Sequence, residues 1–412
     1  MRISWLSVSD QLGGSERVLL TMLRGVRAAR PDWTCQVVLP GSGPLRECVE
    51  GAGASCVVVP MPAALARVGE SAAAREGWNT AATIALGLRL GAGAVALPAY
   101  EALLARTLTA FAPDIIHTNG LKAHVLGVRS RVQSPAVVWH LHEYMARRRL
   151  TRWLMRRYAG RCDAIIANSA SVASDIGSVF DVRLPIHVVR NAVDLNEFQP
   201  EGPRLDLDAL AGLPVAGPEV LRVGIVATFA RWKGQDVFLD AFERIPASRS
   251  IRGYIIGGPM YDTSGSQYSR RELEAMIDAR NLRSRVGLTG FVDSAAAMRS
   301  LDVVVHASVD PEPFGLVIAE AMACGRPLVT TAYGGAAELI EAERDALVAP
   351  PGDSRALATA IERLAGDPAL RESLSVYARA AAGTRFSPER MAADLVSVFE
   401  TAGARRPLAQ SA

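Results

Sequence analysis

Residues 303–331 read VVVHASVDPEPFGLVIAEAMACGRPLVTT. The β-branched run Val303–His306 predicts a strand, and the run Leu328–Thr331 predicts another. Between them a proline-rich loop is followed by an apolar stretch from Gly315 to Gly325, which predicts a helix with a glycine at each end. Two strands that are joined by a helix pair in parallel, because parallel neighbours need a crossover connection. This stretch therefore predicts α/β structure.

The same alternation of short β-branched runs and helical stretches extends in both directions along the chain. A sheet with helices on both faces is the expected result of such an order, so the predicted fold class is α/β and doubly wound. Further strands are predicted at Arg2–Val8, Cys35–Leu39, Cys56–Pro60, Asp114–His117, Ala136–Leu141, Ala164–Ala167, Ile186–Val189, Leu221–Ala227, Gly253–Ile256, Val286–Thr289 and Ala346–Val348.

A segment rich in proline and glycine between residues 195 and 220 interrupts the alternation. It divides the chain into two halves, and 412 residues are too many for one ordinary core. We expect one domain at residues 1–190 and a second at residues 191–387. The last helical stretch, Pro388–Ala402, follows a proline break and is expected to pack against either half, including back on the first.

The composition is that of a globular protein, with 50% hydrophobic and 21% charged residues. A net charge of +3 is far below the imbalance usual in nucleic-acid-binding proteins, so no nucleic-acid partner is expected. The five cysteines are scattered without a CxxC pair, which argues against a zinc site or a disulfide framework and favours a reducing cytoplasm. The apolar stretch Thr80–Leu97 contains Arg89, so we predict an alanine-rich helix of the first domain rather than a membrane span.

The helix that begins at Gly315 offers a binding site as well as structure. Its first backbone N–H groups, near Phe314 to Val317, form an anion site that the helix dipole reinforces. Glu320 lies about five residues inside the helix, or ~8 Å along its axis, which is about the span from a diphosphate to the ribose of a nucleotide. We therefore predict that Glu312 and Glu320 belong to a site for a phosphorylated ligand. The alternative is a loop charge and a solvent-facing carboxylate.

Two cations follow the predicted strand Leu221–Ala227. Arg231 and Lys233 stand just before a helix, at the end of the strand where open α/β sheets bind their ligands. A fork-shaped guanidinium and a flexible ammonium suit a diphosphate, and cations at a helix start are otherwise mildly unfavourable. Gly13-Gly14 follows the first strand and lets backbone approach a phosphate, although such a turn is also common without a ligand.

Together these segments resemble the retaining glycosyltransferases of family four over nearly the whole chain. The E-x7-E pattern of that family is met by Glu312 and Glu320, and its glycine loop by Gly13-Gly14. Asn191-Ala192-Val193-Asp194 is similar to its N-G-V-D turn at the domain junction. The resemblance implies the GT-B architecture, in which two Rossmann-like domains face a central cleft.

One part of the family pattern differs here. The family places an arginine five residues before the lysine, and this chain has Thr228 at that position. Arg231 stands two residues before Lys233 instead, so which residue supplies the second cation is left open. A second choice concerns His140 and His142, which share one side of a predicted strand. The resemblance implies that one of them, most directly His142, contacts the transferred sugar.

The resemblance further implies retaining, metal-independent transfer of a sugar from a nucleotide-diphosphate sugar to an acceptor hydroxyl, without a cofactor. UDP sugars are expected first and GDP sugars next, and the acceptor is a glycan, a lipid-linked glycan or a small molecule. Glu320 would bind the ribose and Glu312 the sugar hydroxyls, while the cations stabilise the departing diphosphate. The implied catalytic residues are His142, Arg231, Lys233 and Glu312; the donor-binding residues are Gly13, Gly14, Gly257, Phe291, Val292, Phe314, Gly315, Leu316 and Glu320; and the acceptor-side residues are His117, Asn119 and Lys122.

Other interpretations remain open at this point. A sugar-nucleotide epimerase has a similar two-domain shape, and a catalytically silent protein could bind the same nucleotide sugar. A nicotinamide-binding protein is disfavoured, because no GxGxxG follows a strand with an acidic residue about 20 positions later. Asp206-Leu207-Asp208 matches a DxD metal pattern but falls in the predicted linker, so we expect no metal. Arg147–Arg161 contains seven arginines, which predict contact with anionic lipids or a phosphate-bearing acceptor, or else a solvated helix face.

Overall fold

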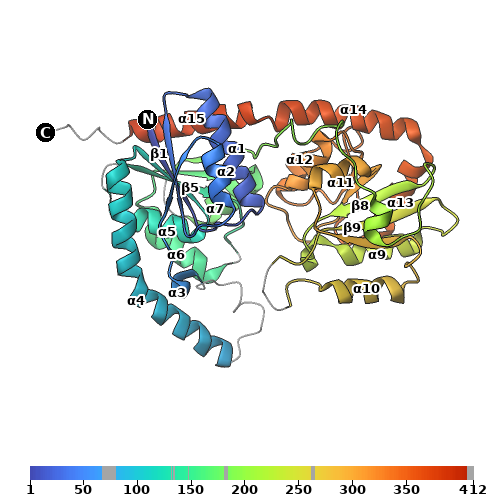
Figure 1. Cartoon of the computed structure of the whole chain (residues 1–412), viewed down its shortest axis with the longest axis horizontal. Helices are drawn as coiled ribbons and strands as arrows, with labels where there is room; N and C mark the ends of the chain where they lie inside the picture. The colour runs from blue at the N-terminus through green and yellow to red at the C-terminus, as the bar shows by residue number, and fades with distance from the viewer. Residues whose placement is uncertain are drawn as a thin grey trace. The chain divides into compact units, whose positions relative to one another are not determined.

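The structure is a computed structural model of the whole chain. It describes residues 1–66, 80–130, 132, 135–146, 148–180, 184–260 and 265–405, with the side chains at 80–94, 149 and 150 excepted. The chain forms two compact units: unit 1 is Met1–Ala192 with the chain from Pro388 onward, and unit 2 is Val193–Ser387 (Figure 1). Both units are α/β with a parallel sheet, which confirms the predicted class.

Unit 1 is built on seven parallel strands in the order β3-β2-β1-β4-β5-β6-β7. Strand β1 lies in the middle, between β2 and β4, and its residues Ile3–Leu6 are buried because helices cover both faces of the sheet. The strands are β1 (Arg2–Ser7), β2 (Thr34–Leu39), β3 (Ser55–Val58), β4 (Ile115–Asn119), β5 (Ala136–Leu141), β6 (Ala164–Ala167) and β7 (Ile186–Val188).

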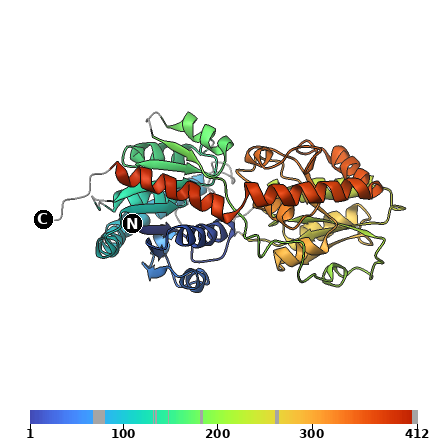
Figure 2. The same cartoon turned by 90° about the horizontal axis from the view of Figure 1, so that it is seen from above.

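The helices of unit 1 are α1 (Gly14–Ala29), α2 (Leu45–Gly51), α3 (Ala63–Ala66), α4 (Thr80–Phe111), α5 (Leu121–Arg129), α6 (Arg149–Ala159), α7 (Ala170–Val179) and α15 (Pro388–Ala404). Helix α1 forms because Leu19, Met22, Leu23 and Val26 make one buried stripe at helical spacing. Helix α15 packs beside α1 (Figure 2). Helices α4, α5, α6 and α7 share a hydrophobic core on the other face of the sheet.

Unit 2 has six parallel strands in the order β10-β9-β8-β11-β12-β13. The chain turns back between β8 and β11, and such a switch point is where open α/β sheets bind ligands, outside the carboxyl ends of the strands. The strands are β8 (Leu221–Val226), β9 (Ile251–Ile256), β10 (Val286–Gly290), β11 (Val303–His306), β12 (Leu328–Thr330) and β13 (Leu347–Val348). The helices are α8 (Leu207–Ala211), η1 (Arg231–Lys233), α9 (Gln235–Arg244), α10 (Arg270–Ala279), α11 (Ser294–Ser300), α12 (Leu316–Ala323), η2 (Gly335–Glu338), α13 (Ser354–Gly366) and α14 (Pro368–Arg385).

Each predicted strand is present, with ends that differ by at most two residues. The stretch Thr80–Leu97 is helical as expected, but it is the first part of the longer α4. Within the residues that the structure describes, no helix combines the length and the apolar character needed to cross a membrane.

Candidate functional site

Two charged side chains meet at the carboxyl end of the unit 2 sheet. Lys233 ends η1, the turn after β8, and Glu312 lies in the loop after β11. The ammonium nitrogen of Lys233 lies 2.9 Å from each carboxylate oxygen of Glu312. The two side chains are only 17% and 10% exposed. The structure therefore brings together, at the switch point, two residues that were predicted for one site from separate motifs.

Backbone contacts hold the two loops against each other. The N–H of Val309 donates to the carbonyl oxygen of Trp232 at 2.9 Å. Gly234 has a φ of +77°, and a Cβ added to it would lie 2.1 Å from the carbonyl oxygen of Ala307. Only glycine fits both the conformation and the space. The position of the ion pair is therefore determined by the backbone on both sides.

Polar side chains surround the carboxylate of Glu312. The hydroxyl of Ser308 donates to one of its oxygens at 2.8 Å, and Nε2 of His306 lies 3.4 Å from the same oxygen. Nδ1 of His306 lies 3.1 Å from the hydroxyl of Thr330. Burial by itself would raise the pKa of Glu312, but the Lys233 ammonium and the His306 contact outweigh it and hold that pKa well below its usual value. The carboxylate is therefore ionised near neutral pH.

His306 and Ser308 were not predicted as site residues. They stand at the end of a buried strand, where a histidine and a serine are usually part of the core. The sequence signal that points to them is their spacing. His306 ends β11 and Ser308 follows two positions later, so in an extended chain both side chains lie on the same side, toward the loop that holds Glu312.

Helices α9 and α12 begin at this edge, each behind a left-handed glycine, Gly234 or Gly315. In the described part of the chain no side chain caps either helix, whereas Ser269, Asp293 and Asp353 cap α10, α11 and α13. The first N–H groups of a helix need a partner, and the helix dipole favours an anion there. The arrangement suits a phosphate group beside Lys233.

The other predicted residues of α12 differ in what they offer. The side chain of Phe314 is 2% exposed and its ring meets Phe386 edge-on at 6.1 Å, so only its backbone is available to a ligand. Leu316 is partly buried against the same core. Glu320 is partly exposed on the helix. Their donor-binding roles remain predictions.

Arg231 does not join the ion pair. Its guanidinium pairs with Glu272 of α10 at 2.7 Å and lies 4.2 Å over the ring of Tyr268. A contact with a diphosphate requires this pair to open, and exposed pairs of this kind are weak. Thr228 stands at the position where the family has its arginine. Its backbone carbonyl oxygen accepts a hydrogen bond from the side-chain amide of the buried Gln235 at 2.7 Å.

The residues predicted for the nucleotide pocket lie at the carboxyl ends of β9 and β10. Gly257 has a φ of +132°, and an added Cβ would lie 2.1 Å from the carbonyl oxygen of Ala227. Phe291 is 59% exposed, and its ring lies against Gly258. Val292 packs on the core instead. Phe291 thus offers a ring face on which a base can stack.

The Asp206-Leu207-Asp208 pattern serves the fold. Asp206 caps α8. Asp208 is 3% exposed and accepts hydrogen bonds from Tyr254 at 2.7 Å and from Arg252 at 2.5 Å. Burial acts to raise the pKa of Asp208, but these donors outweigh it and lower that pKa. The described residues contain no group of three or more histidine, cysteine or acidic side chains placed to hold a metal ion.

In unit 1 the predicted glycine loop joins β1 to α1. The N–H of Gly13 donates to the carboxylate of Glu16 at 3.2 Å, which is the half of a capping box that glycine, with no side chain, can form. Helix α1 begins at Gly14. Asn119 ends the neighbouring strand β4 and is 3% exposed, with its amide nitrogen 3.5 Å from the carbonyl oxygen of Ser15. The two segments meet at the switch point between β1 and β4.

Three histidines of unit 1 lie in contact in a row, with His142 stacked on His140 and His140 edge-on to His117. The rings of His140 and His142 lie 4.1 Å apart, and Nδ1 of His140 lies 3.2 Å from Nε2 of His117. His117 is wholly buried against Trp5, inside the sheet rather than at its edge. His142 is the least buried of the three, and burial lowers its pKa to about 4, so its ring is neutral near pH 7. Lys122 donates to a backbone carbonyl of α3.

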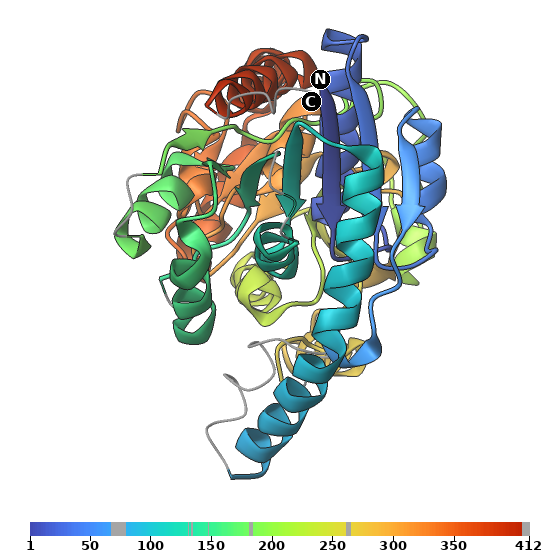
Figure 3. The same cartoon turned by 90° about the vertical axis from the view of Figure 1, so that its left-hand side faces the viewer.

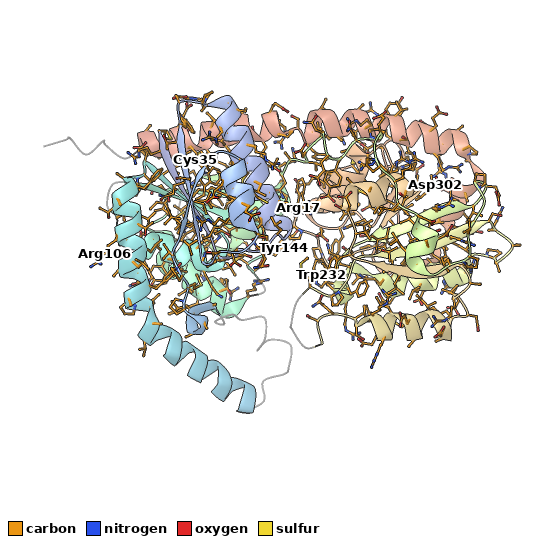
Figure 4. The ribbon with its side chains drawn as sticks, in the orientation of Figure 1. Arg17, Cys35, Arg106, Tyr144, Trp232 and Asp302 are labelled. Carbon is orange, nitrogen blue, oxygen red and sulfur yellow. The ribbon has the colours of Figure 1, made fainter. Side chains whose placement is uncertain are left out.

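Two cavities of unit 2 lie away from the ion pair. One of about 250 Å³ is lined by Asp302 and Arg371, among others, at the amino ends of β8, β9 and β11. The other, of about 380 Å³, lies beside β13 and α13. Figure 4 shows Trp232 and Asp302 on opposite sides of unit 2. We favour the end with Trp232, because it has the switch point and the buried charges.

Known proteins match both halves of the chain. Residues 12–197 match the family described as Glycosyltransferase Family 4, and residues 218–367 match Glycosyl transferases group 1. Each half of the chain therefore resembles a glycosyltransferase domain model. A D-inositol 3-phosphate glycosyltransferase of Xylanimonas cellulosilytica is 35% identical over 254 residues, which are 60% of this chain and 58% of that protein. An alpha-D-kanosaminyltransferase of Streptomyces kanamyceticus is 31% identical over 188 residues, or 45% and 46% of the two chains.

The chain thus matches about half the length of these curated relatives. Solved structures cover more of it. Anabaena HepE, in complex with UDP and glucose, has a TM-score of 0.75 and 24% identity, covering 97% of this chain and 100% of that one. The sucrose-phosphate synthase of Thermosynechococcus elongatus has a TM-score of 0.75 and 22% identity, covering 98% and 100%. These likenesses confirm the predicted GT-B fold class.

Proposed function

We propose that this protein transfers a sugar from a nucleotide-diphosphate sugar to an acceptor hydroxyl, with retention and without a metal ion or other cofactor. The observation that carries the proposal is the buried Lys233–Glu312 pair between two helix N-termini that no described side chain caps. The two domain matches support the reaction class. HepE has been solved with UDP and with UDP-glucose, which supports UDP sugars as the first donors to test, with GDP sugars next.

The diphosphate would lie at the start of α9 and α12. Lys233 would turn from Glu312 toward the phosphate and stabilise the negative charge that develops as the bond to the sugar breaks. Glu312 would keep its place because the Ser308 hydroxyl and His306 still hold it. Its ionised carboxylate would then accept hydrogen bonds from the sugar hydroxyls.

Glu312 does not act as a general base in this proposal, because a carboxylate with a strongly lowered pKa is a weak base. In the proposed step the acceptor oxygen bonds to the anomeric carbon while the bond from that carbon to the phosphate oxygen breaks. The acceptor proton passes to a phosphate oxygen of the leaving group on the same face. Atoms and charges balance without a protein base.

The remaining predicted contacts belong to the same proposal. Glu320 would bind the ribose, and Phe291 would stack on the base. The neutral ring of His142 would hydrogen-bond the transferred sugar, and Asn119 and Lys122 would lie on the acceptor side. The acceptor is a glycan, a lipid-linked glycan or a small molecule.

A nucleotide screen tests the proposal. UDP, GDP, ADP and TDP are added to the full chain with EDTA present, and thermal unfolding is followed. A ligand that binds only the folded state stabilises it by about 2.7 kcal/mol at 100 times Kd. We expect UDP to raise the Tm of the native protein and to change the Tm of Lys233→Met little. The matched control is Arg271→Ser, which removes an exposed cation and should keep the rise in Tm. No shift with any nucleotide overturns the proposal.

Products separate this function from its alternatives. NMR of the glycoside should show the anomeric configuration of the donor. Consumption of the donor without an acceptor would instead indicate an epimerase, and binding without turnover across an acceptor panel would indicate a silent binding protein.

A further inference from the structure

Helix α6 has a buried side and an exposed side of unusual composition. Thr151, Met155 and Ala159 recur every four residues and are at most 9% exposed, so this side packs on the unit 1 core. On the other side, Trp153 is 63% exposed. A tryptophan that is this exposed forfeits most of the apolar burial that its ring can provide.

The same helix concentrates positive charge. Arg156 and Arg157 are exposed and lie three and four positions after Trp153, which places them around the ring on the helix surface. Between residues 144 and 162 the sequence contains seven arginines and no acidic residue. The nearest acid before this stretch, Glu143, pairs with Arg148 at 2.6 Å. The segment from residue 144 to residue 162 therefore carries a strong excess of positive charge in its sequence.

Helix α4 covers the same face of the unit 1 sheet as α6 and also carries exposed apolar side chains. It shares a hydrophobic core with α5 and α6, yet Val95 is 84% exposed and Leu103 is 44% exposed. Figures 1 and 3 show its N-terminal part extending past the rest of unit 1. The sequence of that part, Thr80–Leu97, carries one charge. We call Val95, Leu103, Trp153, Arg156 and Arg157 the α4–α6 surface.

We propose that the α4–α6 surface docks on an anionic lipid bilayer. Arginines at a membrane interface pair with anionic headgroups, tryptophan prefers the interfacial region, and apolar side chains enter the acyl boundary. A bilayer satisfies all three kinds of side chain together, whereas a soluble polyanion would leave the exposed apolar residues without a partner. The protein would bind at the surface of the bilayer without crossing it. This proposal does not depend on the proposed catalytic function.

Vesicle co-sedimentation with the full chain tests this docking. Wild-type protein should bind vesicles that contain phosphatidylglycerol, should not bind pure phosphatidylcholine vesicles, and should be released by high salt. Each basic residue near an anionic surface contributes about a factor of five, so Arg156→Ser/Arg157→Ser should weaken binding about 30-fold. The matched control is Arg271→Ser/Arg355→Ser, which removes the same charge from exposed positions of unit 2 and should change binding by less than twofold.

A second variant tests the apolar part. Trp153→Ser should weaken vesicle binding while leaving net charge and thermal stability nearly unchanged, because the ring is exposed. The proposal is overturned by wild-type protein that does not sediment with anionic vesicles, or by arginine variants that bind as well as the control. It is also overturned if Trp153→Ser binds normally and heparin competes fully with the vesicles, which would indicate a site for soluble polyanions.

Discussion

Lys233 donates to both carboxylate oxygens of Glu312, at 2.9 Å each, although the two residues are 79 positions apart. They meet because β8 and β11 are neighbours and each is followed at once by one of the two loops. Both side chains are mostly buried, so each charge compensates the desolvation of the other. The pair therefore contributes to the stability of unit 2 even without a bound ligand.

Breaking this pair from one side should destabilise the protein. Lys233→Met leaves the Glu312 carboxylate buried beside Ser308 and His306 without its cation, and we expect a loss of about 3 kcal/mol in the free energy of unfolding. Lys233→Met/Glu312→Gln should recover at least half of that loss. Urea denaturation of the two single variants and the double variant gives the coupling energy. Additive losses would mean that the two charges do not depend on each other.

The two carboxylates of the proposed donor site should affect different kinetic constants. Glu312→Ala removes contacts made to the sugar and should lower kcat about 100-fold, whereas Glu320→Ala removes a ribose contact and should raise the donor KM about tenfold. Initial rates over a range of donor concentrations measure both constants. Equal changes in both constants for both variants would contradict this division.

Ser308 should behave as a positioning residue, because it touches Glu312 and no predicted substrate group. Its hydroxyl fixes one carboxylate oxygen at 2.8 Å. Ser308→Ala should lower kcat about tenfold with the donor KM within a factor of two, since the carboxylate keeps its charge but loses a restraint. The same variant should retain the nucleotide-induced rise in Tm. A large rise in KM without a change in kcat would assign Ser308 to the donor pocket itself.

Much of this site follows from local sequence, and the rest depends on tertiary neighbours. Gly315 and Gly234 mark helix starts because each stands directly before a helical stretch of sequence, and buried parallel strands read as continuous β-branched runs. The direction of Arg231 was not predictable, because it depends on Glu272 in a helix 41 positions away. The close approach of Gly257 to the backbone of Ala227 is likewise a product of strand pairing rather than of any motif.

Gly234 should tolerate no side chain. Gly234→Ala places a Cβ 2.1 Å from the carbonyl oxygen of Ala307 and forces alanine to a φ of +77°. Gly212→Ala is a matched control, since Gly212 has a φ of +66° with nothing within 4 Å of its Cβ position. The control should cost about 1–2 kcal/mol from backbone strain alone. Gly234→Ala should cost clearly more in urea denaturation and should weaken nucleotide binding. Equal losses would mean that the loop moves aside freely.

Buried histidines should make unit 1 sensitive to acid. His124 is 1% exposed with Nδ1 2.7 Å from the Thr118 hydroxyl, and burial lowers its pKa to about 3. An unfolded histidine has a pKa of about 6.5, so between pH 6.5 and 3 the unfolded state binds more protons and stability falls as pH falls. At pH 5.0 the loss from His124 is about 2 kcal/mol relative to pH 7.5.

Urea denaturation at pH 7.5, 6.5, 5.5 and 5.0 measures this slope, and His124→Gln should reduce it while lowering stability at pH 7.5. Glu312 does not interfere in this range, because its lowered pKa places its contribution below about pH 4.5, where stability is lost as the carboxylate is protonated. His142, with a pKa lowered to about 4, adds to the slope in the same direction. An unchanged slope in His124→Gln would show that its ring is accessible to protons in the folded state.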